Sequence, residues 1–122
     1  MKSLVSFFEI PAADFNRAVK FYETLFGIKM ERYDDEKEKM AFFPSEDGLC
    51  PGAISWAEGF IPSADGVLIS LTCDDVEQTL KLAAANGGKL YQPKTKIMAE
   101  NRGYFGTFTD SEGNRIGLYS DR

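Results

Sequence analysis

Histidine is absent from this sequence, and that absence removes more chemistry than any other feature of the composition. Histidine is the usual general base near neutral pH and the commonest nitrogen ligand of metal ions. A mechanism or metal centre that depends on an imidazole is therefore excluded. Cysteine is nearly as scarce, since Cys50 and Cys73 are the two in the chain. Their spacing alone does not show whether they can form a disulfide.

The chain also lacks a basic excess and a long apolar run. Its formal net charge is -5, whereas a nucleic-acid or anionic membrane surface needs clustered Lys and Arg. No stretch approaches the about 18 apolar residues of a transmembrane helix. Glu9 and Pro11 interrupt the short apolar run near the start before a signal-peptide core can form. We therefore expect a cytoplasmic protein with reduced thiols and no nucleic-acid or membrane partner. The acidity either keeps the protein soluble or suits a cationic small molecule.

What the sequence does contain is one pattern written twice. A shift of 61 residues places Asp14 on Asp75 and Gly27 on Gly88. Between these positions, apolar residues recur at helical spacing in both copies. In each copy an aspartate suits the N-cap of the helix, with Asp74 as an alternative to Asp75 in the second, and glycine suits its C-terminal end.

Each half predicts a strand, a helix and three further strands. In the first half the strands are expected at Leu4–Ile10, Lys29–Tyr33, Lys39–Phe43 and Gly52–Trp56. In the second half they are expected at Val67–Cys73, Lys89–Gln92, Tyr104–Thr109 and Arg115–Ser120. The predicted fold is α+β, a single domain over residues 1–122 with βαβββ modules at 1–57 and 67–122 and a linker at 58–66. Residues 93–103 are expected to form a long loop, which in a compact domain is more often functional than accidental.

Alternation along the strands sorts the side chains between a helix-covered face and a second face. Phe8 and Ile10 suit the helix, which leaves Phe7 and Glu9 on the other side. The second face is mostly aromatic and apolar with a few hydroxyls, which is typical of a small-molecule pocket. Its predicted lining residues are Phe7, Phe42, Ser55, Leu68, Ser70, Phe105, Thr107, Gly117 and Tyr119, and Trp56 is a further candidate for stacking on a ligand. The same face could instead be the second layer of a packed core.

Glu9 favours the pocket over the core. A carboxylate inside a sealed apolar core costs several kcal/mol unless it is paired or protonated. Arg102 or Arg115 could pair with it, which would weaken this argument. If the protein is an enzyme, Glu9 is the candidate catalytic base, with Tyr104 or Tyr119 as a hydrogen-bond donor.

The order of these motifs resembles the vicinal oxygen chelate superfamily, which includes glyoxalases, bleomycin-resistance proteins and extradiol dioxygenases. The matching motifs are Asp14–Tyr22 with Leu25-Phe26-Gly27, Asp74-Asp75-Val76, Gly87-Gly88-Lys89, Gly103-Tyr104-Phe105 and Asp110–Ile116. The resemblance covers nearly the whole chain. It implies two curled modules that form a mixed sheet around one cavity, and it implies a homodimer.

In metal-dependent members of that superfamily, the cavity holds a divalent ion on four positions. By resemblance these positions fall on Phe7, Leu68, Gly117 and on or next to Ala53, none of which has a donor side chain. One carboxylate with nearby hydroxyls is a poor site for a transition metal. We therefore expect neither a metal nor another cofactor.

Three functions remain open. The first is metal-independent binding of a small aromatic or cationic molecule in a cavity between the modules. The second is a glyoxalase-like lyase or isomerase that uses Glu9 as its base with no metal or a non-standard one. The third is a protein whose cavity has collapsed and which acts through a partner or as a homodimer.

Overall fold

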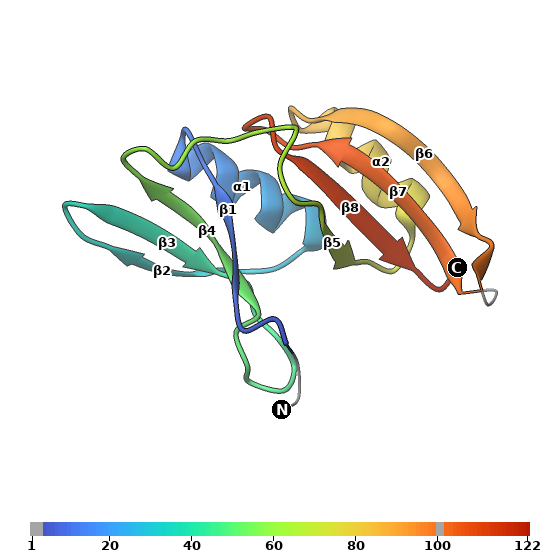
Figure 1. Cartoon of the computed structure of the whole chain (residues 1–122), viewed down its shortest axis with the longest axis horizontal. Helices are drawn as coiled ribbons and strands as arrows, with labels where there is room; N and C mark the ends of the chain where they lie inside the picture. Colours follow the sequence, from blue (N-terminus) through green and yellow to red (C-terminus); the bar gives the residue numbers. More distant parts are fainter. Residues whose placement is uncertain (1–3, 100–101) are drawn as a thin grey trace.

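The computed structural model describes residues 4–99 and 102–122, which form two βαβββ modules (Figure 1). The first module contains β1 (Phe8–Pro11), α1 (Phe15–Phe26), β2 (Glu31–Asp34), β3 (Glu38–Phe42) and β4 (Gly52–Ala57). The second contains β5 (Ile69–Thr72), α2 (Val76–Ala85), β6 (Lys89–Ile97), β7 (Gly103–Thr109) and β8 (Arg115–Ser120). The predicted α+β fold of two βαβββ modules is confirmed. Within the described residues, neither helix has the length and apolar character needed to span a membrane.

Both helices begin and end at the residues that the sequence predicts. The Asp14 side chain accepts a hydrogen bond from the backbone N–H of Arg17, and α1 stops at Gly27, whose φ is 62°. Asp75 caps α2 by accepting from the N–H groups of Glu77 and Gln78, so Asp75 and not Asp74 is the cap. These bonds satisfy backbone donors that the first turn of a helix leaves free.

The two modules repeat one sheet topology. The strand order is β1-β4-β3-β2 in the first sheet and β5-β8-β7-β6 in the second. In each sheet the first strand pairs in parallel with the last, and the other neighbours are antiparallel. The sheets are therefore mixed, and the first strand of each module lies at an edge.

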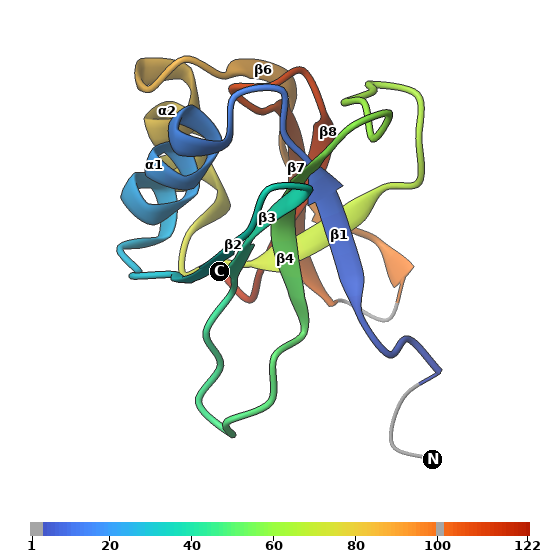
Figure 2. The ribbon, with the colours of Figure 1, turned by 90° about the vertical axis from the view of Figure 1, so that its left-hand side faces the viewer.

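The core lies between the sheets and the two helices and takes side chains from both modules. Figure 2 shows the helices on one side of the sheets, which leaves the other face of each sheet uncovered by a helix. Val19 and Tyr22 of α1 and Phe108 of β7 are fully buried, and the rings of Phe21 and Phe108 lie 6.0 Å apart across the module boundary. Because each buried side chain of this size contributes about 1.5–3 kcal/mol, this shared core holds the modules together.

Three predicted boundaries are wrong. The first strands of the two modules start later than expected, at Phe8 and at Ile69, so Phe7 and Leu68 precede the strands. Strand β6 runs to Ile97, through most of the stretch predicted to be a loop. Pro93 is tolerated there because β6 is an edge strand and Pro93 falls at a shift in the register between Gln92 and Thr95, where its missing N–H breaks no ladder bond. The remaining connection is short, and residues 100–101 lie outside the described part of the chain.

Candidate ligand-binding site

The open face of the first sheet carries the predicted aromatic residues. Glu9 is in register with Ala53, Ala53 with Phe42, and Phe42 with Glu31, so these four residues share one face. The rings of Phe7 and Phe42 lie 6.5 Å apart at a tilt of 52°. Phe7 is 38% exposed, which places it at a surface and not in a sealed second core layer.

Glu9 lies beside these aromatic residues. Its Oε1 accepts a hydrogen bond of 2.8 Å from the hydroxyl of Ser55, which is itself buried. Glu9 also lines a pocket of about 270 Å³ between β1 and the second module, and Phe60 and Ile61 of the linker line the same pocket. Glu9 is thus an exposed, anchored carboxylate, and the cost of a carboxylate sealed in an apolar core does not arise.

Arg115 lines the same small pocket, but it does not neutralise Glu9. Its guanidinium lies 3.7 Å above the centre of the Tyr91 ring, in a cation–π contact. Within residues 4–99 and 102–122, the ion pair that the structure records is Arg17 with Glu112. The possible pairing of Arg115 with Glu9 is therefore not made in the single chain.

The open face of the second sheet carries the other predicted residues. Ser70 is in register with Gly117, and Gly117 with Thr107. Tyr119 is in register with Phe105 in the same way. The hydroxyl of Tyr119 donates to Asp121 at 2.8 Å and to the backbone carbonyl of Arg102, and the bond to Asp121 raises the pKa of Tyr119. Since its hydroxyl is engaged with the chain itself, Tyr119 is a poor candidate for a proton donor.

The two open faces do not form one pocket within the single chain. Both lie away from the helices (Figure 2). The pockets of the described residues divide the predicted set. A pocket beside β2 and β3 takes in Phe42, another at the junction of the modules takes in Ser70, and the pocket containing Glu9 takes in neither. A cavity shared by all nine residues therefore stays a prediction.

Trp56 is misplaced in the prediction. It alternates with Ser55 along β4, points to the helix side and packs against the core, with the Lys39 ammonium 5.6 Å from the ring centre. Both faces of β4 carry apolar residues, so the alternation of polar and apolar side chains that would reveal its orientation is missing from the sequence.

Sequence reasoning missed the role of the turn Asp110–Asn114, which the structure places at the boundary of the two modules. Asp110 is 3% exposed and accepts four hydrogen bonds: from the Tyr22 hydroxyl at 2.6 Å, from the Asn114 amide, and from two backbone N–H groups of the turn. The Asn114 side chain donates to the carbonyl of Pro11 and accepts from the N–H of Ser63 in the linker. One turn of the second module thereby binds β1, α1 and the linker.

Glu112 in the same turn completes this connection. Its carboxylate accepts from the backbone N–H groups of Ala13 and Asp14 at the start of α1 and pairs with Arg17 at 2.8 Å. Burial by itself would raise the pKa of Glu112, but the hydrogen bonds from Arg17, Asp14 and Ser111 outweigh it and lower that pKa. A negative charge at a helix N-terminus is also favoured by the helix dipole.

Comparison with known proteins shows the family to which the chain belongs. The family model "Glyoxalase/Bleomycin resistance protein/Dioxygenase superfamily" matches residues 4–118. The chain belongs to this superfamily. A "Glyoxylase-like domain-containing protein" of Didymella fabae is 32% identical over 115 residues, which cover 90% of this chain and 88% of that protein. That identity extends the superfamily assignment over both modules.

Solved structures of the superfamily share the fold. A glyoxalase/bleomycin resistance protein from Albidiferax ferrireducens T118 superposes with a TM-score of 0.72 at 18% identity, covering 97% of this chain and 99% of that one. Glyoxalase I from Zea mays superposes with a TM-score of 0.71 at 18% identity, but the chain spans only 45% of that protein. At such identities the likeness concerns the fold alone.

The residues of this superfamily member do not fit the divalent ion that the fold family implies. At three of the four positions where the resemblance places metal ligands, the side chains of Phe7, Leu68 and Ala53 or its neighbours offer no donor atoms. At the fourth, a Cβ on Gly117 would collide with the hydroxyl of Ser70, so the space for a longer ligand is already filled. Among the described residues, no three His, Cys, Asp or Glu side chains lie together in a group that could hold a metal ion.

Proposed function

We propose that this superfamily member binds a small aromatic or cationic molecule on the open face of its first sheet, without a metal ion. The observation that carries the proposal is the contact of the exposed Phe7 ring with the partly buried Phe42 ring, beside the Glu9 carboxylate that Ser55 holds in place. Aromatic faces stack on flat ligands and attract cations, and a fixed carboxylate adds a charge of the complementary sign.

A second copy of the chain would complete this site. The open face of the first sheet carries Glu9, and the register adds Glu31 and Glu38 to it. The open face of the second sheet carries Lys89 and Arg115, both in register with Thr109. Opposite charges favour the placement of one face on the other in a homodimer. The Nε of Arg115 is buried without a hydrogen-bond partner among the described residues, and a partner carboxylate would satisfy it.

Titration with benzyltrimethylammonium tests the ligand site, with its neutral isostere neopentylbenzene as the uncharged comparison. We expect Phe42→Ala and Glu9→Gln each to weaken binding of the cation by up to about tenfold, the range of a cation–π or exposed charge contact. Leu90→Ala is the matched control, because Leu90 is 54% exposed and lies on the other face of the second sheet. Equal binding by all variants, or tightly bound stoichiometric Ni, Zn or Fe in the purified protein, would overturn the proposal.

Sedimentation equilibrium tests the second copy. We expect a dimer whose dissociation constant rises with salt and rises again in Arg115→Glu, because both changes weaken attraction between the charged faces. The double variant Arg115→Glu with Glu9→Arg should recover part of the loss. A monomer at all concentrations would show that the site is not completed by a partner copy.

A lyase or isomerase reaction with Glu9 as general base is the second candidate function. It is favoured by the position of Glu9, which lines a pocket and whose carboxylate is anchored by Ser55. If turnover of a carbonyl substrate is found, Glu9→Gln should lower it by at least about 100-fold, the contribution usual for a general base. Turnover that survives this substitution would remove the proposed base.

A further inference from the structure

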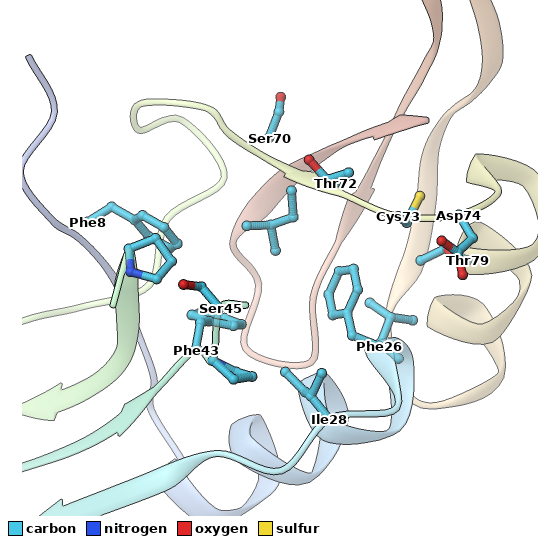
Figure 3. A pocket seen from close by; sticks show the side chains of 14 residues that line it. Phe8, Phe26, Ile28, Phe43, Ser45, Ser70, Thr72, Cys73, Asp74 and Thr79 are labelled. Atoms are coloured by element: carbon cyan, nitrogen blue, oxygen red, sulfur yellow. The ribbon is translucent and has the colours of Figure 1, made fainter. Parts of the chain in front are cut away.

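A second and larger pocket lies at the junction of the two modules, between strand β5 and the end of α1 (Figure 3). Its volume is about 590 Å³. The residues that line it come from the end of α1, the loop after β3, strand β5 and the start of α2. Glu9, Phe7 and Phe42 do not line it, so it is separate from the site proposed above.

One part of this junction pocket is apolar. Phe8 and Phe43 form its wall in the first module, with ring centres 5.7 Å apart. Phe26 and Ile28 close it from the end of α1, and Leu71 from β5. Figure 3 shows Phe26, Ile28 and Phe43 gathered around the same space. A pocket of this volume with mainly apolar walls is typical of small-molecule sites.

The opposite end of the junction pocket is polar and acidic. Cys73, Asp74 and Thr79 lie together there, far from Phe8 (Figure 3). Among the described residues the Asp74 carboxylate has no hydrogen bond or ion pair, since Arg122 contacts only the main-chain carbonyl of Asp74, at 3.5 Å. None of the side chains that line the pocket carries a positive charge.

The Cys73 thiol lies at this acidic end of the junction pocket, and its pKa is shifted there. Its pKa is raised by burial, which outweighs the lowering from hydrogen bonds with Thr79 and the backbone of Asp75, and the neighbouring carboxylates of Asp75 and Asp74 add a smaller rise. A thiol held in its neutral form is a weak nucleophile, so the chemistry offered at this end is that of a carboxylate and hydroxyls.

We infer that the junction pocket is a second binding site, for an amphipathic cation that has an ammonium group on an aromatic or aliphatic body. The body fills the space between Phe26, Ile28 and Phe43, and the ammonium lies against Asp74. The uncompensated carboxylate distinguishes a cation from an anion of the same shape.

The test uses three probes that share one body and differ in charge: 4-phenylbutylamine, 4-phenylbutanol and 4-phenylbutyrate. Each is titrated into the full chain and followed by backbone amide shifts in NMR spectra. We expect saturable shifts around Ile28, Phe43 and Cys73. The amine should bind about two- to fivefold more tightly than the alcohol, because an exposed ion pair contributes that much, and the butyrate should bind most weakly.

Two pairs of variants locate the interaction. Asp74→Asn should remove the advantage of the amine over the alcohol and leave alcohol binding unchanged. Glu77→Gln, at an exposed acid in the first turn of α2 outside the pocket, should keep that advantage. Ile28→Trp should fill the pocket and weaken all three probes, with Leu49→Trp, at a 60% exposed residue outside it, as the control.

Asp74 is exposed and its carboxylate makes no hydrogen bond among the described residues, so its variant should fold even if Ile28→Trp does not. Equal affinity for amine and alcohol in the natural chain, or the absence of saturable shifts, would overturn the inference. Shifts confined to Phe7, Glu9 and Phe42 would do the same, while supporting the site on the first sheet.

Discussion

The turns at residues 44–48 and 109–113 occupy the same position in the two modules, yet they make different contacts. A shift of 65 residues aligns Gly48 with Gly113, and both glycines have positive φ, 78° and 98°. The first turn is exposed, and Asp47 bonds only Ser45 and the N–H of Leu49 next to it. The second contains the buried Asp110 and contacts α1, β1 and the linker.

In this chain the turn Asp110–Asn114 therefore connects the two modules, whereas among the described residues the turn at 44–48 makes no hydrogen bond that does so. Both turns kept the backbone shape that the repeat requires. Only the second acquired long-range bonds, because its place in the fold faces the start of α1. Substitutions at matched positions of the two turns should therefore differ in how much they lower the free energy of unfolding. Four predictions test this, in order of decreasing effect.

Asp110→Ala should give the largest effect. It leaves the Tyr22 hydroxyl, the Asn114 amide and two N–H groups without their acceptor. We expect a loss of about 3 kcal/mol in the free energy of unfolding, since each orphaned buried donor is costly. Ser45→Ala, the matched position of the first turn, should cost less than about 0.5 kcal/mol. Urea denaturation measures both, and similar losses would contradict the comparison.

Glu112→Gln should cost about 2 kcal/mol, because it weakens the charged bonds to the start of α1 and the pair with Arg17. Asp47→Asn is its counterpart in the first turn, where the bonds are local and exposed. We expect little change for that variant in the same urea titration. A larger loss for Asp47→Asn would show that the first turn is the more important one.

Tyr22→Phe removes one hydroxyl from the buried network and should cost about 1 kcal/mol, because Asp110 keeps its other three donors. Tyr33→Phe removes a hydroxyl that bonds Asp35 at the surface of the first module. Its loss should be near zero in thermal denaturation. Equal melting temperatures for the two variants would contradict the buried role of Tyr22.

The pH dependence of stability should give the smallest effect. The pKa of Glu112 is lowered below its ordinary value of 4.5, so the folded state favours the ionised carboxylate. Its stabilisation is present above pH 4.5 and is lost as the pH falls through the folded pKa. The free energy of unfolding, measured by denaturation at several values between pH 6 and 3, should therefore depend less steeply on pH in Glu112→Gln than in the natural chain. An unchanged slope would show that Glu112 contributes nothing through its charge.

Much of the fold could be predicted because the signals are local. The caps Asp14 and Asp75 and the stop at Gly27 act within one turn of their helices, and the structure confirms them. The strand predicted at Lys89–Gln92 is present, but its continuation to Ile97 was not predicted, because only the pairing with β7 makes Pro93 acceptable in a strand. The predicted site shows the same limit. The alternation of side chains along the strands correctly placed Glu9 and Phe42 on one face of the sheet, but it did not predict the orientation of Trp56.

The sequence by itself determined the two-module plan, the helix ends and the lack of metal-binding side chains at the family positions, because each depends on residue type and short spacing. The tertiary structure alone decided that Asp110 and Glu112 connect the modules and that Asp74 lies at the end of an apolar pocket. These contacts join residues tens of positions apart, and no pattern within one strand or helix encodes them.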